Sequence, residues 1–410
     1  MPLSANVVHI TLNARGGSER LAVSTINALS AAGYEVTLTT FEAPNLETIE
    51  SAYGRVAVKN IKKVRTIDIF ADQNGASSSG YDITINTHGD MLPFFKQSFS
   101  PSNAVTYCHY PLAWYLAAIN ESNYSNMLES MKLRCMPAEL HEKYIQSAQE
   151  SYKKMMENSA VLTNSQYSRD AIFKTFGIDS TVLSPPVEVE AFRDACLDSK
   201  GRDDYVLVIS RFHPSKKIEN AIILACLLKQ ANIGKGMNIV GNISPYEIGY
   251  YEYLRHTVQK YGLEDYVCFE TNVELSRLFA LMRQSKVYLH PLPGEPFGIS
   301  TVEAMSAGLV PVVPDTGGHC EFVPHRYQFH TFRQGVGAIA SAMSASDSER
   351  YKISLSVQKF SSSNFSSQFQ RLIESLANAT ASIDQNRMSK PEMVSPSPAS
   401  YPQSKHAAAA

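Results

Sequence analysis

The sequence has few of the features that mark secreted scaffolds, zinc proteins or nucleic-acid-binding proteins. Its six cysteines are scattered along 410 residues without a C-x-x-C pair, which argues against a zinc site and a disulfide scaffold and fits a reducing cytoplasm. Charged residues are only 19% of the chain and the net charge is −2, so no nucleic-acid partner is expected. No D-x-D motif stands out, and we expect neither a metal nor a cofactor.

Segments that would enter a membrane are also lacking. No window reaches the ~18 apolar residues that a bilayer-spanning helix requires, and the N-terminal sequence MPLSANVVHIT lacks the basic and apolar regions of a signal peptide. Any membrane contact is therefore expected to be peripheral, at the cytoplasmic face. One local run is basic, at Lys59, Lys62, Lys63 and Arg65. It is either a solvated surface or a surface that docks on anionic lipid.

What the sequence does have is strand–helix alternation, which predicts parallel sheets covered by helices. In the first half we expect strands at 7–11, 36–40, 56–58, 83–86, 105–107, 161–163 and 182–183, with helices such as 18–32 and 138–158 between them. After the two prolines of 184–187 the alternation resumes, with strands at 205–210, 237–240, 267–269, 287–290 and 310–313. The helices expected there are 217–230, 250–261, 275–284 and 298–307, followed by 347–360 and 366–376.

This pattern predicts an α/β protein with two doubly wound, Rossmann-like domains that face a cleft. We expect a first domain at 1–186 and a second domain at 187–350. Helices at 351–378 should return toward the first domain, and the polar segment 379–410 should be a disordered tail. Open α/β sheets bind ligands at the carboxyl ends of their strands, so loops at those ends are the places to look for a site.

One such loop contains two glutamates on either side of a helix start. Glu295 falls after the strand at 287–290, and Glu303 falls inside the helix that begins near Gly298. The first N–H groups of that helix, from Gly298, Ile299 and Ser300, should form an anion site that suits a diphosphate. Glu303 could then accept hydrogen bonds from a ribose, and Glu295 from the hydroxyls of a transferred sugar. The alternative is a capping glutamate and an ordinary surface glutamate.

A second loop supplies positive charge. Arg211 follows the strand at 205–210, and Lys216 and Lys217 lie five and six residues further on. Two cations at the carboxyl end of a strand would neutralise a diphosphate and the charge that grows on its leaving oxygen. We prefer Lys216 as the partner of Arg211. The alternative is a solvated Lys-Lys turn.

The segment E-P-F-G-I-S-T-V-E-A-M-S-A-G-L-V-P-V-V, from Glu295 to Val313, resembles the signature of the family-four retaining glycosyltransferases, which have the GT-B fold. The Gly317-Gly318 pair that precedes Glu321 and the spacing of Arg211 and Lys216 also match. The resemblance covers residues 6 to 376. It implies an acceptor-side domain at 1–186 and a nucleotide-sugar-binding domain at 187–350. It also implies that Glu295, Arg211 and Lys216, together with His109 of the first domain, are catalytic. The donor-binding residues that it implies are Gly16, Gly17, Arg211, Lys216, Gly241, Val273, Glu295, Phe297, Gly298, Ile299, Ser300 and Glu303.

The first domain carries weaker likenesses. Gly16-Gly17 in N-A-R-G-G-S-E-R resembles the family's G-G-A-E-R loop, although alone it could be a tight turn. The Y-C-H-Y-P segment around His109 resembles the C-H-F-P or T-H-Y-P segment of dolichol-pathway mannosyltransferases, which implies that His109 lines the sugar site. The alternative is a structural histidine. His88 and Asp90 also close a strand, and we assign them to the acceptor side.

The resemblance implies a retaining transfer of a hexose, with mannose favoured, from a nucleotide diphosphate sugar to a glycan or lipid-linked acceptor. GDP-mannose is the expected donor, and a UDP-sugar stays open. Trp114, Tyr115 and Leu116, with the basic run, are expected to contact a membrane. The alternatives are a sugar-nucleotide epimerase, a phosphorylase or a non-catalytic sugar-nucleotide-binding protein of the same fold. A dehydrogenase is disfavoured because the G-x-G-x-x-G fingerprint is absent.

Overall fold

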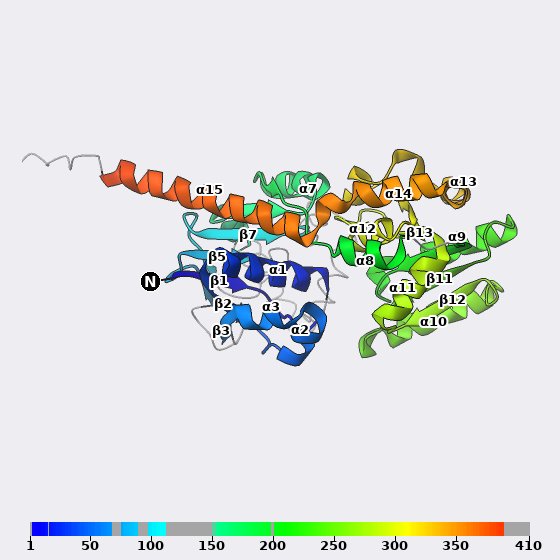
Figure 1. The fold of residues 1–410 in the computed structure, drawn as a ribbon, viewed down its shortest axis with the longest axis horizontal. Helices are drawn as coiled ribbons and strands as arrows, with labels where there is room; N and C mark the ends of the chain where they lie inside the picture. The colour runs from blue at the N-terminus through cyan, green and yellow to red at the C-terminus, as the bar shows by residue number, and fades with distance from the viewer. Residues whose placement is uncertain are drawn as a thin grey trace, which may run out of the picture.

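The computed structural model describes residues 2–14, 16–67, 75–88, 97–111, 150, 152–197 and 201–388. Within them the chain forms two main sheets that lie side by side along the long axis of the molecule, each with helices packed on it (Figure 1). Every strand pairing recorded in these residues is parallel, so the carboxyl ends of the strands in one sheet meet at one edge. None of the described helices is both long and apolar enough to cross a membrane.

The first sheet has seven strands in the order β3-β2-β1-β5-β7-β8-β9. These strands are β1 (Leu3–Val8), β2 (Tyr34–Thr40), β3 (Ile61–Thr66), β5 (Ile83–Asn86), β7 (Ala104–Cys108), β8 (Ala160–Thr163) and β9 (Thr181–Val182). The described helices of this half are α1 (Gly17–Ala31), α2 (Leu46–Tyr53), α3 (Arg55–Asn60) and α7 (Gln166–Phe176). Two further short strands, β4 (Ala76–Ser77) and β6 (Gln97–Ser98), pair separately.

The second sheet has six strands in the order β12-β11-β10-β13-β14-β15. These strands are β10 (Asp203–Ile209), β11 (Gly236–Gly241), β12 (Val267–Thr271), β13 (Ser285–Leu289), β14 (Val310–Pro314) and β15 (Gln328–Phe329). Its α-helices are α8 (Val189–Cys196), α9 (Ile218–Gln230), α10 (Ile248–Lys260), α11 (Leu275–Gln284), α12 (Ile299–Ser306), α13 (Phe332–Met343) and α14 (Asp347–Ser356). The 3-10 turns used below are η2 (Pro214–Lys216), η4 (Gly318–Glu321) and η6 (Gln358–Phe360).

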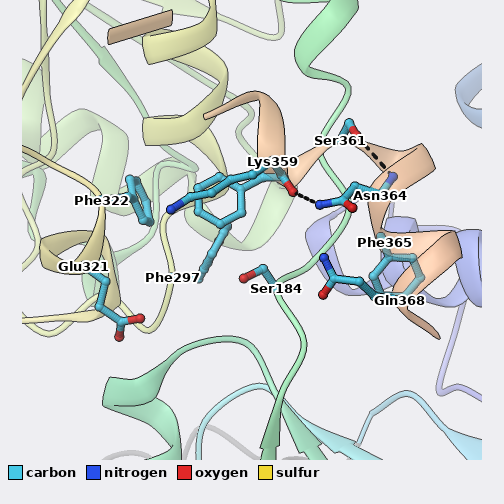
Figure 2. A pocket seen from close by; sticks show the side chains of 10 residues that line it. Ser184, Phe297, Glu321, Phe322, Lys359, Ser361, Asn364, Phe365 and Gln368 are labelled. Carbon is cyan, nitrogen blue, oxygen red and sulfur yellow. Dashed lines mark hydrogen bonds between the residues drawn. The ribbon is translucent and has the colours of Figure 1, made fainter. Parts of the chain in front are cut away.

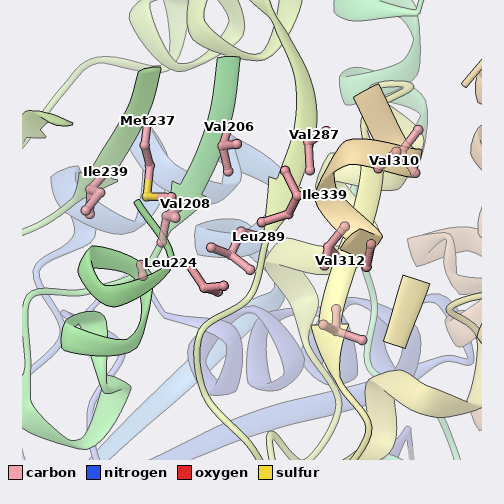
Figure 3. Packing of buried hydrophobic residues seen from close by; sticks show 14 of the residues in the cluster. Val206, Val208, Leu224, Met237, Ile239, Val287, Leu289, Val310, Val312 and Ile339 are labelled. Carbon is pink, nitrogen blue, oxygen red and sulfur yellow. The ribbon is translucent and has the colours of Figure 1, made fainter. Parts of the chain in front are cut away.

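The core of the second domain is built on the middle strands of this sheet. Figure 3 shows valine, isoleucine, leucine and methionine side chains of β10, β11, β13 and β14 meeting Leu224 of α9 and Ile339 of α13. Parallel strands that are covered on both faces are apolar along most of their length, as these are. Each fully buried aliphatic side chain contributes about 1.5–3 kcal/mol through its removal from water. This packing fixes the strand ends that carry the site.

The two domains are joined by more than one segment. The backbone N–H of Val187, just after the two prolines, donates to the carbonyl of Phe360 at 2.9 Å. The chain then returns as α15 (Ser362–Met388), which runs alongside the first domain (Figure 1). Phe365, Phe369 and Ile373 of α15 are buried in the core of that domain. The return therefore ties the end of the second domain to the first.

Several expectations from the sequence need correction. Residues 56–58, expected as a strand, lie in helix α3, and the strand is the basic segment β3 instead. β3 is the edge of its sheet, where exposed lysines are tolerated because one side has no neighbouring strand. Helices α8 and α13 were not expected. α15 continues to Met388, past the point at which the disordered tail was expected to begin. The rest of the tail and residues 138–149 of the expected helix 138–158 lie outside the described residues.

Candidate active site

The start of helix α12 is shaped by a glycine. Gly298 has φ +93° and ψ +65°, a left-handed conformation that favours glycine, and a Cβ there would lie 2.9 Å from Thr301 Oγ1. The N–H groups of Thr301 and Val302 donate to the carbonyl of Gly298. The earlier N–H groups, from Ile299 and Ser300, have no partner within the helix because they begin it. The turn thus leaves an anion-binding group of donors at the carboxyl edge of the sheet.

Glu303 lies in α12 and faces the first domain. Its side chain is 12% exposed, and its Oε1 is 3.5 Å from Nη1 of Arg20 in α1. Burial raises the pKa of Glu303, because the attraction of Arg20 offsets only part of the loss of solvation and the charge of Glu188 opposes ionisation. A partly buried carboxylate with one distant cation still has acceptor capacity for ligand hydroxyls.

Glu295 is held by two side chains of the second domain. Its Oε2 is 3.1 Å from Nζ of Lys216 and 3.3 Å from Nε2 of His290. Burial by itself raises the pKa of Glu295, but the charge of Lys216 and the contact with His290 outweigh it and hold the pKa well below its usual range. Glu295 is therefore an ionised hydrogen-bond acceptor at neutral pH.

Two glycines after β14 pack closely against the backbone of the Glu295 loop. The N–H of Gly318 donates to the carbonyl of Glu295 at 2.8 Å. Gly317 has φ +131°, and a Cβ on Gly318 would lie 1.9 Å from the carbonyl oxygen of Pro296. The Gly-Gly pair is thus required by the close crossing of two backbones.

The cationic loop separates the two lysines clearly. Lys216 ends η2 and reaches Glu295, whereas Lys217 has φ +50° and an exposed side chain at the start of α9. Arg211 is exposed two residues after β10. Lys216 therefore lies in the same group of residues as Glu295, and its preference over Lys217 as the phosphate-binding lysine stays a prediction.

The neighbouring strand end packs against the Arg211 loop. A Cβ on Gly241 would lie 1.8 Å from the carbonyl oxygen of Ser210, so this close approach requires glycine. The carbonyl of Gly241 accepts the N–H of Asn272 at 3.0 Å, and the half-buried Val273 follows. Gly241 and Val273 thus lie in adjacent loops at one edge of the sheet.

The Gly16-Gly17 turn of the first domain contacts α12. A Cβ on Gly17 would lie 2.5 Å from Cδ1 of Ile299, so a larger residue would require the end of that side chain to move. The N–H of Gly16 donates to Glu19 Oε2 at 2.7 Å, which closes the turn. Ser165 Oγ also donates across the domains, to the carbonyl of Pro296 at 2.7 Å. The predicted glycine loop and helix start therefore face each other.

His109 and His88 belong to a cluster at the strand ends of the first domain. Nε2 of His109 is 3.2 Å from the carbonyl oxygen of Thr87, and its ring centroid is 6.4 Å from that of His88. His88 in turn lies 4.8 Å from the buried His9. Burial holds the pKa of His88 well below its ordinary value, and His9 and His109 add to this effect. His88 is therefore neutral and lies next to His109 in this cluster. Asp90 and Trp114–Leu116 lie outside the described residues.

The ring of Phe297 packs at the junction between the two domains. Its ring packs on Phe322 and Phe360, with centroids 5.4 and 5.2 Å away, and its side chain is 4% exposed. It lines a pocket of about 250 Å³ where the two domains join. Figure 2 shows it there with Glu321 and Lys359. The ring is thus used to pack this junction, and a contact of Phe297 with a donor stays a prediction.

Sequence reasoning also missed functional candidates. Arg20 and Glu19 stand in the G-G-S-E-R stretch itself, and His290 directly follows a strand, so each had a local signal. Their contacts with Glu303, His9 and Glu295 depend on packing between distant segments. Among the described residues, no three His, Cys, Asp or Glu side chains group so that they could hold a metal ion.

Comparison with known proteins places these residues in context. Residues 192–345 match the family model of the group 1 glycosyl transferases. The chain is 26% identical over 305 residues to the GDP-Man:Man(3)GlcNAc(2)-PP-Dol alpha-1,2-mannosyltransferase of Dictyostelium discoideum, covering 68% of this chain and 60% of that protein. It is 24% identical over 363 residues to an alpha-1,3/1,6-mannosyltransferase of Kluyveromyces lactis, covering 75% and 69%. The chain thus spans about three fifths of the first relative.

A solved glycosyltransferase of Rickettsia africae superposes with a TM-score of 0.63 at 12% identity, covering 92% of this chain and 98% of that one. This likeness concerns the fold. It confirms the predicted GT-B arrangement of two parallel-sheet α/β domains.

Proposed function

Residues 192–345 form a group 1 glycosyl transferase domain, as the segment from Glu295 to Gly318 predicted, and from this premise we propose that the chain is a retaining glycosyltransferase. It moves a hexose from a nucleotide diphosphate sugar to a glycan or lipid-linked acceptor. The observation that carries the proposal is the ionised Glu295, held by Lys216 beside the helix start at Gly298 and across from Gly17.

In this proposal the diphosphate binds at the start of α12. The N–H groups of Ile299 and Ser300 and the positive end of the helix favour an anion there. Lys216 has three N–H donors, so it can contact a phosphate oxygen while it keeps Glu295. Arg211, exposed at the neighbouring strand end, supplies the second cation.

The two glutamates divide the rest of the donor between them. Glu303 accepts hydrogen bonds from the ribose hydroxyls, and Arg20 then loses part of its hold on that carboxylate. Glu295 accepts hydrogen bonds from the hydroxyls of the transferred sugar. Gly241 and Val273, in the adjacent loops, place backbone groups near the base.

The chemical step breaks the bond between the anomeric carbon and the diphosphate oxygen. Arg211, Lys216 and the α12 N–H groups stabilise the charge that develops on the departing diphosphate, without a divalent ion. The acceptor hydroxyl attacks from the face that the diphosphate leaves, which retains the anomeric configuration, and its proton passes to the leaving phosphate. His109 lines the sugar side from the first domain. Contact between the domains excludes water from this region.

We propose GDP-mannose as the donor because the Dictyostelium relative is named for a GDP-mannose-dependent transfer. The same name motivates a lipid-linked glycan as acceptor. The exposed Lys59, Lys62 and Lys63 of α3 and β3, with Arg65, are then the surface that approaches the anionic cytoplasmic leaflet.

Thermal-shift screening of GDP, UDP, ADP and their sugars tests the donor class, because a ligand that binds only the folded protein raises its melting temperature. The proposal expects the largest shift with GDP-mannose and GDP. Release of an altered sugar nucleotide without any acceptor would instead identify an epimerase. If no nucleotide or nucleotide sugar raises the melting temperature, the proposal fails.

A further inference from the structure

A chain of buried polar side chains links the start of α12 to Glu295. Ser300 Oγ is 2.8 Å from the hydroxyl of Tyr288, and that hydroxyl is 3.1 Å from Nδ1 of His290. The other ring nitrogen of His290, Nε2, faces Glu295 Oε2 at 3.3 Å. Tyr288 is fully buried and His290 is 3% exposed. We propose that His290 is a positioning residue that orients the carboxylate of Glu295 and is itself anchored on α12 through Tyr288 and Ser300.

The hydrogen positions along this series of side chains can be assigned by starting from Glu295. An ionised carboxylate only accepts hydrogen bonds, so Nε2 of His290 carries a hydrogen. In the tautomer with that hydrogen, Nδ1 accepts from the Tyr288 hydroxyl, which in turn accepts from Ser300. Burial raises the pKa of Tyr288, so its hydroxyl keeps its proton. The links Ser300–Tyr288 and Tyr288–His290 then each have one donor and one acceptor, and Nε2 of His290 meets Glu295 Oε2 in a charge contact of 3.3 Å.

The ring of His290 is also fixed by packing. His319 lies edge-on against it, with ring centroids 5.4 Å apart. Nε2 of His319 is 2.9 Å from the carbonyl oxygen of Pro314. Burial and the neighbouring His290 lower the pKa of His319 to about 4, so it is neutral at pH 7 and does not repel its neighbour. His290 therefore has little freedom to turn away from Glu295.

The consequence for Glu295 is an asymmetric carboxylate. Both of its recorded ion-pair contacts, with Lys216 and with His290, are made to Oε2. Among the described residues none is recorded on Oε1, which is left to accept a sugar hydroxyl. When Lys216 turns toward a phosphate, His290 keeps the carboxylate in place. This inference rests on the proposed function, because it assigns Glu295 to the transferred sugar.

If His290 orients Glu295, replacing His290 should affect binding of the sugar and binding of the diphosphate differently. Loss of the His290 contact should weaken interactions with the sugar and leave those with the diphosphate intact. His290→Asn removes the Nε2 donor, whereas His290→Gln places an amide donor near its position. Tyr288→Phe removes the anchor hydroxyl and keeps the buried ring.

The experiment compares these variants in hexose transfer and in their affinity for GDP and GDP-mannose, with UDP and UDP-glucose in parallel. We expect His290→Asn to lose about tenfold or more in kcat/KM, as for a lost hydrogen bond to a charged group, with affinity for the nucleoside diphosphate unchanged. His290→Gln should recover most of the loss, and Tyr288→Phe should show a smaller loss of the same kind. If the His290 variants do not fold, the kcat/KM of Tyr288→Phe tests the proposal.

Three outcomes would overturn the inference. One is an active wild-type protein with equal activity in His290→Asn. Another is equal loss in His290→Asn and His290→Gln, which would indicate packing alone. The third is a parallel loss of nucleoside diphosphate affinity. A wild-type protein that binds no nucleotide sugar would overturn the proposed function itself, and is distinguished by its failure before any variant is made.

Discussion

Nη1 of Arg20, in the first domain, lies 3.5 Å from Oε1 of Glu303, in the second. The side chains are 26% and 12% exposed, so this pair is partly shielded from solvent. Its carboxylate is the one that we assign to the ribose of the donor. The same oxygen atoms thus serve contact between the domains and ligand binding, and the two functions should be coupled.

The first prediction concerns this carboxylate. Glu303→Gln removes the charge and one acceptor oxygen, and should raise the KM for the nucleotide sugar about tenfold or more. The exposed Glu264→Gln is the matched control and should leave the KM unchanged. Steady-state kinetics over a range of donor concentrations measure the effect. Donor KM values within twofold of each other in both variants would contradict the assignment.

The second prediction concerns backbone packing beside the Arg211 loop. A Cβ on Gly241 would lie 1.8 Å from the carbonyl oxygen of Ser210, whereas at Gly249, in α10, nothing lies within 4 Å. Gly241→Ala should therefore destabilise the protein by roughly 2 kcal/mol or more, and Gly249→Ala should stabilise it by about 0.5–1 kcal/mol. Urea unfolding measures both. Equal midpoints for the two variants would contradict the close approach.

The sequence predicted the second domain better than the first. The strands and helices around Glu295 follow from local apolar runs, and Gly298 marks its helix start with the conformation that it adopts. Strand β3 was not predicted because its lysines and arginine interrupt the alternation of apolar and polar residues that identifies a strand. It is an edge strand, and the burial that would impose alternation is missing on one side.

The sequence could name candidate site residues only where a local pattern marks them. Arg211, Lys216 and Glu295 each come soon after a predicted strand, which made them candidates. The contact of Arg20 with Glu303 depends on how two domains meet, which no local pattern encodes. The direction of Phe297 likewise depends on Phe322 and Phe360, which come from other segments.

The third prediction concerns pH and the turn at Gly16. Burial by itself raises the pKa of Glu19, but the hydrogen bond and charge of His9 and the N–H groups of the turn lower it to about 2 from 4.5. A lowered pKa stabilises the fold above the unfolded value, and this stability is lost as the pH falls from 4.5 toward 2. It amounts to at most about 3.5 kcal/mol, at about 1.4 kcal/mol per pKa unit.

Glu19→Gln should remove that part of the acid sensitivity. The free energy of unfolding of the variant should be lower than that of the wild type at pH 6, and the difference should shrink below pH 4.5 and disappear only as the pH falls to about 2. Chemical denaturation at a series of pH values tests this. A constant difference between the two proteins across the whole range would contradict the role of Glu19.

The fourth prediction concerns the basic surface at β3. Each basic residue near an anionic membrane contributes about 1 kcal/mol to binding, so reversing the charge of Lys62 and Lys63 to Glu should weaken binding roughly tenfold or more. Flotation with phosphatidylserine-containing vesicles measures it, with phosphatidylcholine vesicles as reference. Charge reversal at Lys260 and Lys352, exposed on the second domain, is the matched control. If the wild-type protein floats with neither kind of vesicle, the membrane role is contradicted.

The most direct test of the central claim is hexose transfer by two variants that differ by one position. Lys216 contacts Glu295 at 3.1 Å, whereas Lys217 points to solvent beside it. Purified wild-type protein and each variant are incubated with GDP-mannose and a lipid-linked oligosaccharide, and the mass of the product is measured by mass spectrometry. We predict a gain of one hexose with the wild type and with Lys217→Ala, and a loss of about a hundredfold or more in rate with Lys216→Ala. Equal rates in the two lysine variants would contradict the account.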